Sequence, residues 1–223
     1  TMTYNEALTS EGKPYSLEIG MVAFSNCSEL EMVQLSENVT KIGNSAFEGC
    51  ESLKELVLPE SIKKLGYRII KGTGISSITI PKNVKESGWY PDHDAGYYGA
   101  LAGAGYLKEV VFESGMTEIP AYILASGGYE SAVQKIVIPK TVKEIGGYAF
   151  YKCTGITEIS LPEELTEIGT YAFSKCTGLK NVDVPKKVSK IWDSAFSDCT
   201  GLKSVTMTYN EALTSEGKPY SLE

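Results

Sequence analysis

Apolar residues recur along this chain at a fixed step of 23 residues, with polar residues between them. The clearest copy of the repeat begins at Ile42-Gly43 and continues through Ala46-Phe47 to Cys50. Regular copies of this phrase also begin at Ile19, Ile145, Ile168 and Ile191. One such unit cannot bury its apolar face alone, whereas stacked units bury a continuous one. The pattern therefore predicts a solenoid in which each repeat forms one coil.

Each repeat contains a short strand, and in five of them proline follows it, at Pro59, Pro81, Pro139, Pro162 and Pro185. In the segment 53–58 the side chains of Leu56 and Leu58 alternate inward, as a half-buried strand requires. Pro59 then ends the hydrogen-bonding ladder, because it has no N–H. The Ile-Gly pair is expected to close a second extended stretch, with Gly supplying a backbone shape that other residues resist. Because paired strands lie about 4.8 Å apart, eight coils would make a rod about 40 Å long.

The Ala-Phe-x-x-Cys stretch is predicted to form a turn or one helical turn. Its Phe should stack on the Phe of the next coil, and its Cys should lie over the next Cys. This interpretation requires Phe24 to lie beside Phe47, and Phe150 beside Phe173.

Eight coils can be counted, five regular and three altered. The regular coils cover residues 19–64 and 145–207, and the altered coils cover 65–144. In the altered part Ile69-Ile70 replaces Ala-Phe, and about nine extra residues precede Ala100. We expect all of these coils to belong to one domain over residues 1–223.

The segment 1–18 is identical to the segment 206–223. Either the parent protein carries tandem blocks of 205 residues, or the overlap was introduced deliberately. Neither end has the polar capping coil that an isolated solenoid usually needs. We therefore expect a rod that continues in the parent protein or stacks end to end with another copy.

The charge balance narrows the choice of partners. Lys and Arg total 21 and Asp and Glu total 28, so the net charge is −7. This sign argues against a nucleic-acid backbone or an anionic membrane surface as the main partner. No apolar run reaches eighteen residues, so no membrane insertion is expected.

The Ile-Gly-x-x-Ala-Phe-x-x-Cys phrase, together with the Leu-x-x-Ile-x-Ile-Pro strand, resembles the BspA-like class of bacterial leucine-rich repeats. The resemblance covers residues 19–207 and implies a right-handed, curved solenoid of short parallel strands. It also implies a cell-surface or secreted protein, whose signal segment would lie outside this sequence. Some members of the class act as adhesins for host matrix proteins or other microbes. The resemblance therefore favours a non-enzymatic module for protein binding or adhesion, with a passive spacer as the alternative.

Five cysteines rule out a complete set of disulfides within one chain. They follow the repeat, and no Cys-x-x-Cys motif is present, so we expect free structural thiols, with oxidation or metal capture as the alternative. The single His has no suitably spaced Ser or Cys nucleophile, and no glycine-rich phosphate loop follows a strand. The sequence therefore predicts no catalytic residue, no metal site and no cofactor.

The altered middle concentrates aromatic residues in a loop, and insertions of this kind often lie on the binding face of a solenoid. The candidate partner-binding residues in this loop are Trp89, Tyr90, His93, Tyr97 and Tyr98. Two alternatives remain open: the loop covers a coil that lacks Phe and Cys, or Asp92, His93 and Asp94 bind a metal.

The outward positions of the strands form a second candidate surface. Its predicted contact residues are Gln34, Thr79, Ser160 and Asp183. A carbohydrate-binding protein would be expected to line up aromatic residues there, and none appears. This surface therefore fits a protein partner or no partner.

Overall fold

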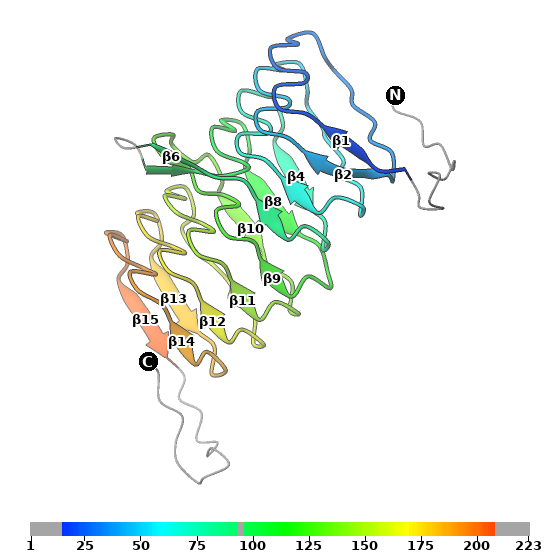
Figure 1. Cartoon of the computed structure of the whole chain (residues 1–223). Coiled ribbons are helices and arrows are strands. Elements are labelled where there is room, and N and C mark those ends of the chain that lie inside the picture. Colours follow the sequence, from blue (N-terminus) through cyan, green and yellow to red (C-terminus); the bar gives the residue numbers. More distant parts are fainter. Residues whose placement is uncertain (1–14, 93–95, 208–223) are drawn as a thin grey trace.

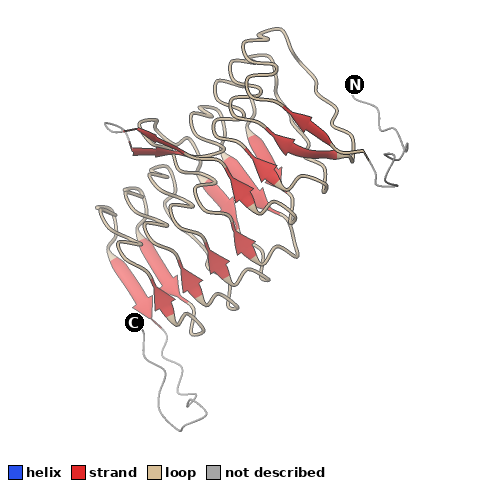
Figure 2. Cartoon of the chain, viewed as in Figure 1, coloured by secondary structure: helices blue, strands red, loops and turns tan. Residues whose placement is uncertain are grey.

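The computed structural model of the chain describes residues 15–92 and 96–207. In these ranges the chain winds into about eight coils stacked as a parallel β-solenoid (Figure 1). Within the described ranges there are strands and turns and no helix (Figure 2). The predicted solenoid is confirmed, and the turn, rather than the helical turn, is the correct description of the Ala-Phe-x-x-Cys stretch.

The first face of the solenoid is built by the longer strand of each coil, which in several coils precedes proline. Three of them, β4 (Ser77–Ile80), β8 (Glu109–Phe112) and β10 (Lys135–Val137), form a parallel sheet in the order β10-β8-β4. In the later coils β13 (Asn181–Val184) pairs in parallel with β15 (Ser204–Met207). Burial alternates along β4 and β13 as predicted. We call this side of the molecule the strand face.

The second face is built by the shorter strands that contain or approach the Ile-Gly pair. One sheet joins β1 (Leu17–Ile19), β2 (Val39–Ile42), β3 (Lys64–Leu65) and β5 (Glu86–Ser87). The other joins β9 (Glu118–Ile119), β11 (Glu144–Ile145), β12 (Glu167–Ile168) and β14 (Lys190–Ile191). Strands β5 and β9 do not pair with each other, so this face is interrupted in the altered region.

The glycine of the Ile-Gly pair is required by close contact between coils. A Cβ atom on Gly43 would lie 2.6 Å from the backbone of Gly20, and one on Gly169 would lie 2.6 Å from the backbone nitrogen of Gly147. Neither glycine has a positive φ. The expectation of an unusual backbone shape was therefore wrong, because the missing side chain is what lets the coils approach.

The turns use the left-handed conformation at two positions in each regular coil. Ser45 and Gly49 have φ values of 53° and 76°, and Tyr148 and Lys152 have 57° and 58°. Between these positions the backbone N–H of Phe47 donates to the carbonyl oxygen of Ile69 in the next coil, at 3.0 Å. The turns are thus joined from coil to coil by main-chain hydrogen bonds.

Phenylalanine rings form the predicted column inside the solenoid. The ring centroids of Phe24 and Phe47 lie 5.4 Å apart, and those of Phe150 and Phe173 lie 5.0 Å apart. Phe173 also stacks on Phe196, at 5.0 Å. In the altered region Phe112, which belongs to strand β8, contacts Phe150 edge-on at 6.2 Å. The expected stacking is confirmed in the regular coils.

The cysteines lie beside this column. The Cys50 thiol donates to the carbonyl oxygen of Phe24 at 3.0 Å, and the Cys176 thiol donates to that of Phe150 at 3.2 Å. All five thiols are free, and of these Cys27 is exposed while the other four are buried. These contacts support the structural role that the sequence predicted for them.

The extra residues of the altered region form an antiparallel hairpin, which projects from the stack of coils (Figure 1). Its strands are β6 (Tyr90–Asp92) and β7 (Gly96–Tyr98), and Tyr90 pairs with Tyr98. The hairpin follows β5 directly in the chain, at the point where the second face is interrupted.

Candidate partner-binding site

A column of tyrosine rings runs along the outside of the turns. Tyr122, Tyr148 and Tyr171 occupy the same repeat position, and each has the left-handed conformation, with φ between 56° and 61°. The ring of Tyr148 stacks on that of Tyr122 at 4.9 Å and on that of Tyr171 at 4.9 Å. Because the turns repeat in register, the same backbone conformation directs each ring to the same side.

The hairpin extends this column by one more ring. Trp89, which precedes β6, stacks on Tyr122 with centroids 5.2 Å apart and planes 19° apart. Tyr97 of β7 lies edge-on to Tyr148 at 4.6 Å and also contacts Tyr122 at 5.6 Å. We call these five rings (Trp89, Tyr97, Tyr122, Tyr148 and Tyr171) the aromatic cluster.

Two tyrosines of the cluster have a raised pKa. Burial, and then the neighbouring Tyr97, raise the pKa of Tyr148 well above the ordinary value for tyrosine. Burial, followed by Tyr97, also raises the pKa of Tyr122. Tyr122 and Tyr148 therefore present neutral hydroxyl groups.

Tyr98 anchors the hairpin to the body of the solenoid. Its ring is 5% exposed, and the Arg68 guanidinium lies 4.1 Å from the ring centroid. The ring of Tyr129 packs against Tyr98 at 5.2 Å. Tyr98 therefore covers an altered coil, as one of the two alternative interpretations of the loop expected, and it does not face solvent.

Trp89 and Tyr90 have a different environment. Each is 48% exposed, although Trp89 stacks on Tyr122 and Tyr90 contacts Tyr67 at 5.6 Å. The loop thus divides between inward and outward residues. His93 and Asp94, on which the metal hypothesis depends, lie outside the described residues. Among the residues that are described, no group of three or more potential ligands could hold a metal ion.

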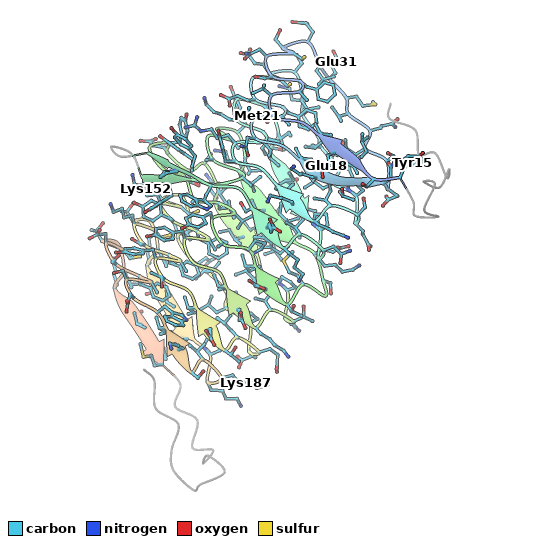
Figure 3. The ribbon with its side chains drawn as sticks, in the orientation of Figure 1. Tyr15, Glu18, Met21, Glu31, Lys152 and Lys187 are labelled. Atoms are coloured by element: carbon cyan, nitrogen blue, oxygen red, sulfur yellow. The ribbon has the colours of Figure 1, made fainter. Side chains whose placement is uncertain are left out.

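A cavity of about 500 Å³ lies where the second face is interrupted. It is lined by Asn44, Lys64, Tyr67, Lys85, Glu86, Ser87, Gly88, Trp89, Ala121 and Tyr122. We call it the junction cavity. Trp89 and Tyr122 belong both to the junction cavity and to the aromatic cluster. Figure 3 labels Lys152, four residues after Tyr148 in the chain, near the projecting hairpin.

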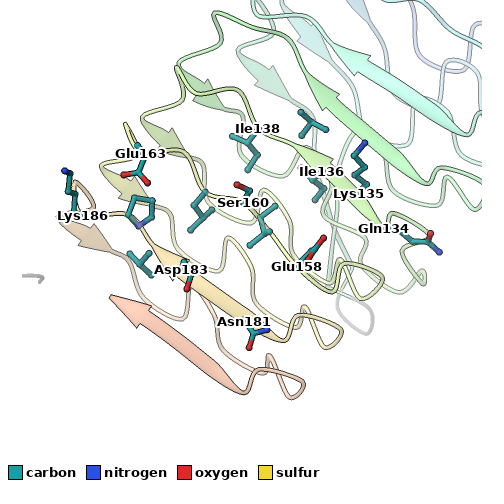
Figure 4. A pocket seen from close by; sticks show the side chains of 15 residues that line it. Gln134, Lys135, Ile136, Ile138, Glu158, Ser160, Glu163, Asn181, Asp183 and Lys186 are labelled. Atoms are coloured by element: carbon teal, nitrogen blue, oxygen red, sulfur yellow. The ribbon is translucent and has the colours of Figure 1, made fainter. Parts of the chain in front are cut away.

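The strand face carries a larger groove of about 1100 Å³ (Figure 4). Ser160 and Asp183 line it, together with the half-buried side chains of Ile136 and Ile159. The backbone of 158–161 forms no ladder with β10 or β13, which leaves the strand face open at this coil. Gln34 and Thr79 lie on other coils, exposed, and do not line the groove.

The sequence-predicted residues are therefore not gathered into one site. Trp89, Tyr90 and Tyr97 lie together, while Ser160 and Asp183 share the strand-face groove. Tyr122, Tyr148 and Tyr171 were missed. The available signal was a tyrosine two residues before Phe150 and Phe173, and at the same position before Leu124.

The chain is similar to known repeat proteins. A family model for a BspA type leucine rich repeat region matches in six copies, over residues 16–91 and 123–218. No curated protein matches the chain. No helix within the described ranges is long and apolar enough to cross a membrane.

Solved structures of leucine-rich repeat proteins also match. A protein from Bacteroides ovatus is 24% identical, with a TM-score of 0.49, over 89% of this chain and 61% of that one. A leucine rich repeat protein from T. pallidum is 29% identical, with a TM-score of 0.46, over 58% of this chain and 57% of that one. A leucine rich cell surface protein from Faecalibacterium prausnitzii is 22% identical, with a TM-score of 0.41, over 92% of this chain and 66% of that one. The chain thus spans less than two thirds of the length of each protein.

Proposed function

We propose that this chain, which belongs to the family of BspA-type leucine-rich repeat proteins, is a non-enzymatic binding module of a bacterial cell-surface or secreted protein. Its partner would be a protein, either of the host matrix or of another microbial surface, and its role would be adhesion. The family resemblance supports the location and the type of role. The choice of surface rests on the aromatic residues of the hairpin.

The observation that carries this proposal is the exposure of Trp89 and Tyr90 on a hairpin that ring contacts hold against the solenoid. Each is 48% exposed, while Tyr97 and Tyr98 fasten the hairpin to the turns and to Arg68. Aromatic side chains supply a large part of the binding energy at protein interfaces. Rings that are already held in place lose little conformational entropy on binding.

Binding to a panel of purified host matrix proteins tests the proposal. We expect Trp89→Ala to weaken binding about thirtyfold, the effect of losing about 2 kcal/mol at an interface centre. Trp192→Ala is the matched control, because Trp192 is 41% exposed and lies in the last regular coil. If both variants bind a matrix protein as the unmodified chain does, the hairpin is not the contact surface.

The alternative of a passive spacer makes a different prediction. A spacer would tolerate Trp89→Ala and Tyr90→Ala, and its function would change only with the number of coils. Measuring adhesion of cells that display the chain with coils added or removed separates the two roles.

A further inference from the structure

The junction cavity combines aromatic walls with a small set of charged and amide groups. We propose that it binds an acidic oligosaccharide, a chain of sugar rings that carry carboxylate groups. This inference rests on the proposed function and deepens it, since the glycan would be the part of a surface glycoprotein that the module recognises.

The cavity exists because of the inserted hairpin. In a regular solenoid the strand after β5 would pair with it, but β5 and β9 are not paired. The hairpin leaves the stack at this point and places Trp89 beside the opening. The resulting volume, about 500 Å³, is in the range of sites for small ligands, about 300–1,000 Å³.

The aromatic wall matches the flat face of a sugar ring. Tyr122 covers one face of the Trp89 indole, and Trp89, at the end of the column of stacked rings, remains 48% exposed and lines the cavity. Tyr67 lines the cavity from the preceding coil. The C–H groups on one face of a pyranose ring are apolar and pack against aromatic rings, whereas a peptide strand would gain more from an open sheet edge.

The polar groups of the cavity match hydroxyl and carboxylate groups. Asn44 is fixed in orientation, because its side-chain oxygen accepts the backbone N–H of Tyr67 at 3.1 Å. Lys64 forms an ion pair with Glu86 at 2.6 Å. In the part of the chain that is described, Lys85 forms no ion pair and is exposed at the cavity.

The charge of the cavity also opposes that of the whole chain. Two lysines and one glutamate line it, which gives a local charge of +1, whereas the chain carries −7. A positive site on an acidic protein selects an anionic ligand near that site and repels it elsewhere. The ligand should therefore carry carboxylates, and binding should weaken as salt is added.

Tryptophan fluorescence gives a direct test. The chain has two tryptophans, so Trp192→Phe leaves Trp89 as the only one, and excitation at a wavelength that tyrosine does not absorb isolates its emission. The probe is a tetrasaccharide of alternating glucuronic acid and N-acetylglucosamine, and the control probe is a neutral tetrasaccharide of glucose. We expect a saturable change in Trp89 emission with the acidic probe, and little or none with the neutral probe.

Two surface variants test the role of charge. Lys85→Gln should weaken binding of the acidic probe about tenfold, the effect of losing one charged hydrogen bond. The control is Lys180→Gln, which changes an exposed lysine on the strand face, and this variant should bind the probe as the unmodified chain does.

Calorimetry on the unmodified chain checks that fluorescence misses no binding. Absence of saturable binding by both methods, or equal binding of the neutral probe, overturns the inference.

The two proposals can fail separately. Binding to a matrix glycoprotein is measured before and after enzymatic removal of its glycans. If the deglycosylated protein binds equally well, the glycan inference is wrong and the protein-binding proposal stands. If the acidic tetrasaccharide binds while no matrix protein does, the cavity is a glycan site and the protein-binding proposal fails.

Discussion

The indole ring of Trp89 stacks on the phenol ring of Tyr122, with centroids 5.2 Å apart and planes inclined by 19°. Trp89 belongs to the inserted segment, whereas Tyr122 belongs to the turn of the following coil. The insertion is therefore integrated into the repeat, since it adds a ring to a column that the turns already form. This contact joins the hairpin to the solenoid on the side where the candidate partner residues are exposed.

A double-mutant cycle should detect this contact. We expect Trp89→Ala and Tyr122→Ala to show a coupling of about 0.5–1.5 kcal/mol in the free energy of unfolding, the usual value for a stacked aromatic pair. Urea unfolding measures it. The control cycle pairs Trp192→Ala with Tyr122→Ala, and these distant changes should add within about 0.5 kcal/mol. Additive effects in the Trp89 cycle would contradict the stacking.

The sequence predicted the phenylalanine column because its geometry depends only on the repeat. Residues 23 apart lie over one another when every coil has the same length, so Phe150 must approach Phe173. The tyrosine column has the same spacing between Tyr148 and Tyr171, but its direction depends on the left-handed turn. A pattern of apolar and polar residues does not reveal that conformation at a tyrosine. The sequence therefore indicated the aromatic residues of the inserted loop, but not the tyrosines of the turns.

The phenylalanine column can be tested by substituting one ring in its interior and one at its end. Phe173 is fully buried between Phe150 and Phe196, so Phe173→Ala should lower the free energy of unfolding by about 3–5 kcal/mol. Phe24 is half-buried and contacts one other ring, Phe47, so Phe24→Ala should cost clearly less. Urea unfolding followed by circular dichroism gives both values. Equal costs would mean that the rings do not form a continuous core.

The contact between coils can be tested at two glycines. Gly169→Ala places a Cβ atom 2.6 Å from the backbone nitrogen of Gly147 and 2.7 Å from the carbonyl oxygen of Ile145. Backbone atoms cannot move aside easily, so we expect a loss of about 1–3 kcal/mol in stability. Gly20→Ala is the matched control, since no atom lies within 4 Å of its Cβ position. Thermal unfolding should separate the two variants, and a similar melting temperature for both would refute the close approach.

The sequence alone could not show which aromatic residues of the hairpin are buried and which are exposed. Tyr98 and Trp89 belong to the same aromatic segment, yet Tyr98 is buried beside Arg68 while Trp89 is exposed. That difference is set by pairing within the hairpin and by partners on other coils, Tyr129 and Tyr122. These partners are distant in sequence and lie in coils that depart from the repeat, so spacing alone did not identify them.

Thiol labelling should distinguish the exposed cysteine from the buried ones. Burial raises the pKa of Cys153 to about 12, and burial also raises the pKa of Cys176 well above its usual value. Because the thiolate is the reactive form, these thiols should react slowly at pH 8. Cys27 is exposed, so we expect one rapid reaction with a disulfide reagent in the native protein and five in guanidinium chloride. More than one rapidly reacting thiol in the native state would contradict the burial of the other four cysteines.

The aromatic cluster should make the protein sensitive to alkali. Burial and then Tyr97 raise the pKa of Tyr148, so the folded state holds this proton more tightly than the unfolded state does. The stabilisation is complete below pH 10, the ordinary tyrosine value, and is lost as the pH rises further because the unfolded chain ionises first. Tyr148→Phe removes this contribution, so the stability of this variant should fall less steeply between pH 10 and pH 11 than that of the unmodified protein.

The difference between the two slopes should be below about 1.4 kcal/mol per pH unit, since solvent reaches part of the Tyr148 ring. Burial also raises the pKa of the buried cysteines, but they are present in both proteins and their contribution cancels in the comparison. Urea unfolding at each pH gives the two slopes, and identical slopes would show that Tyr148 ionises as readily in the folded chain as in the unfolded one.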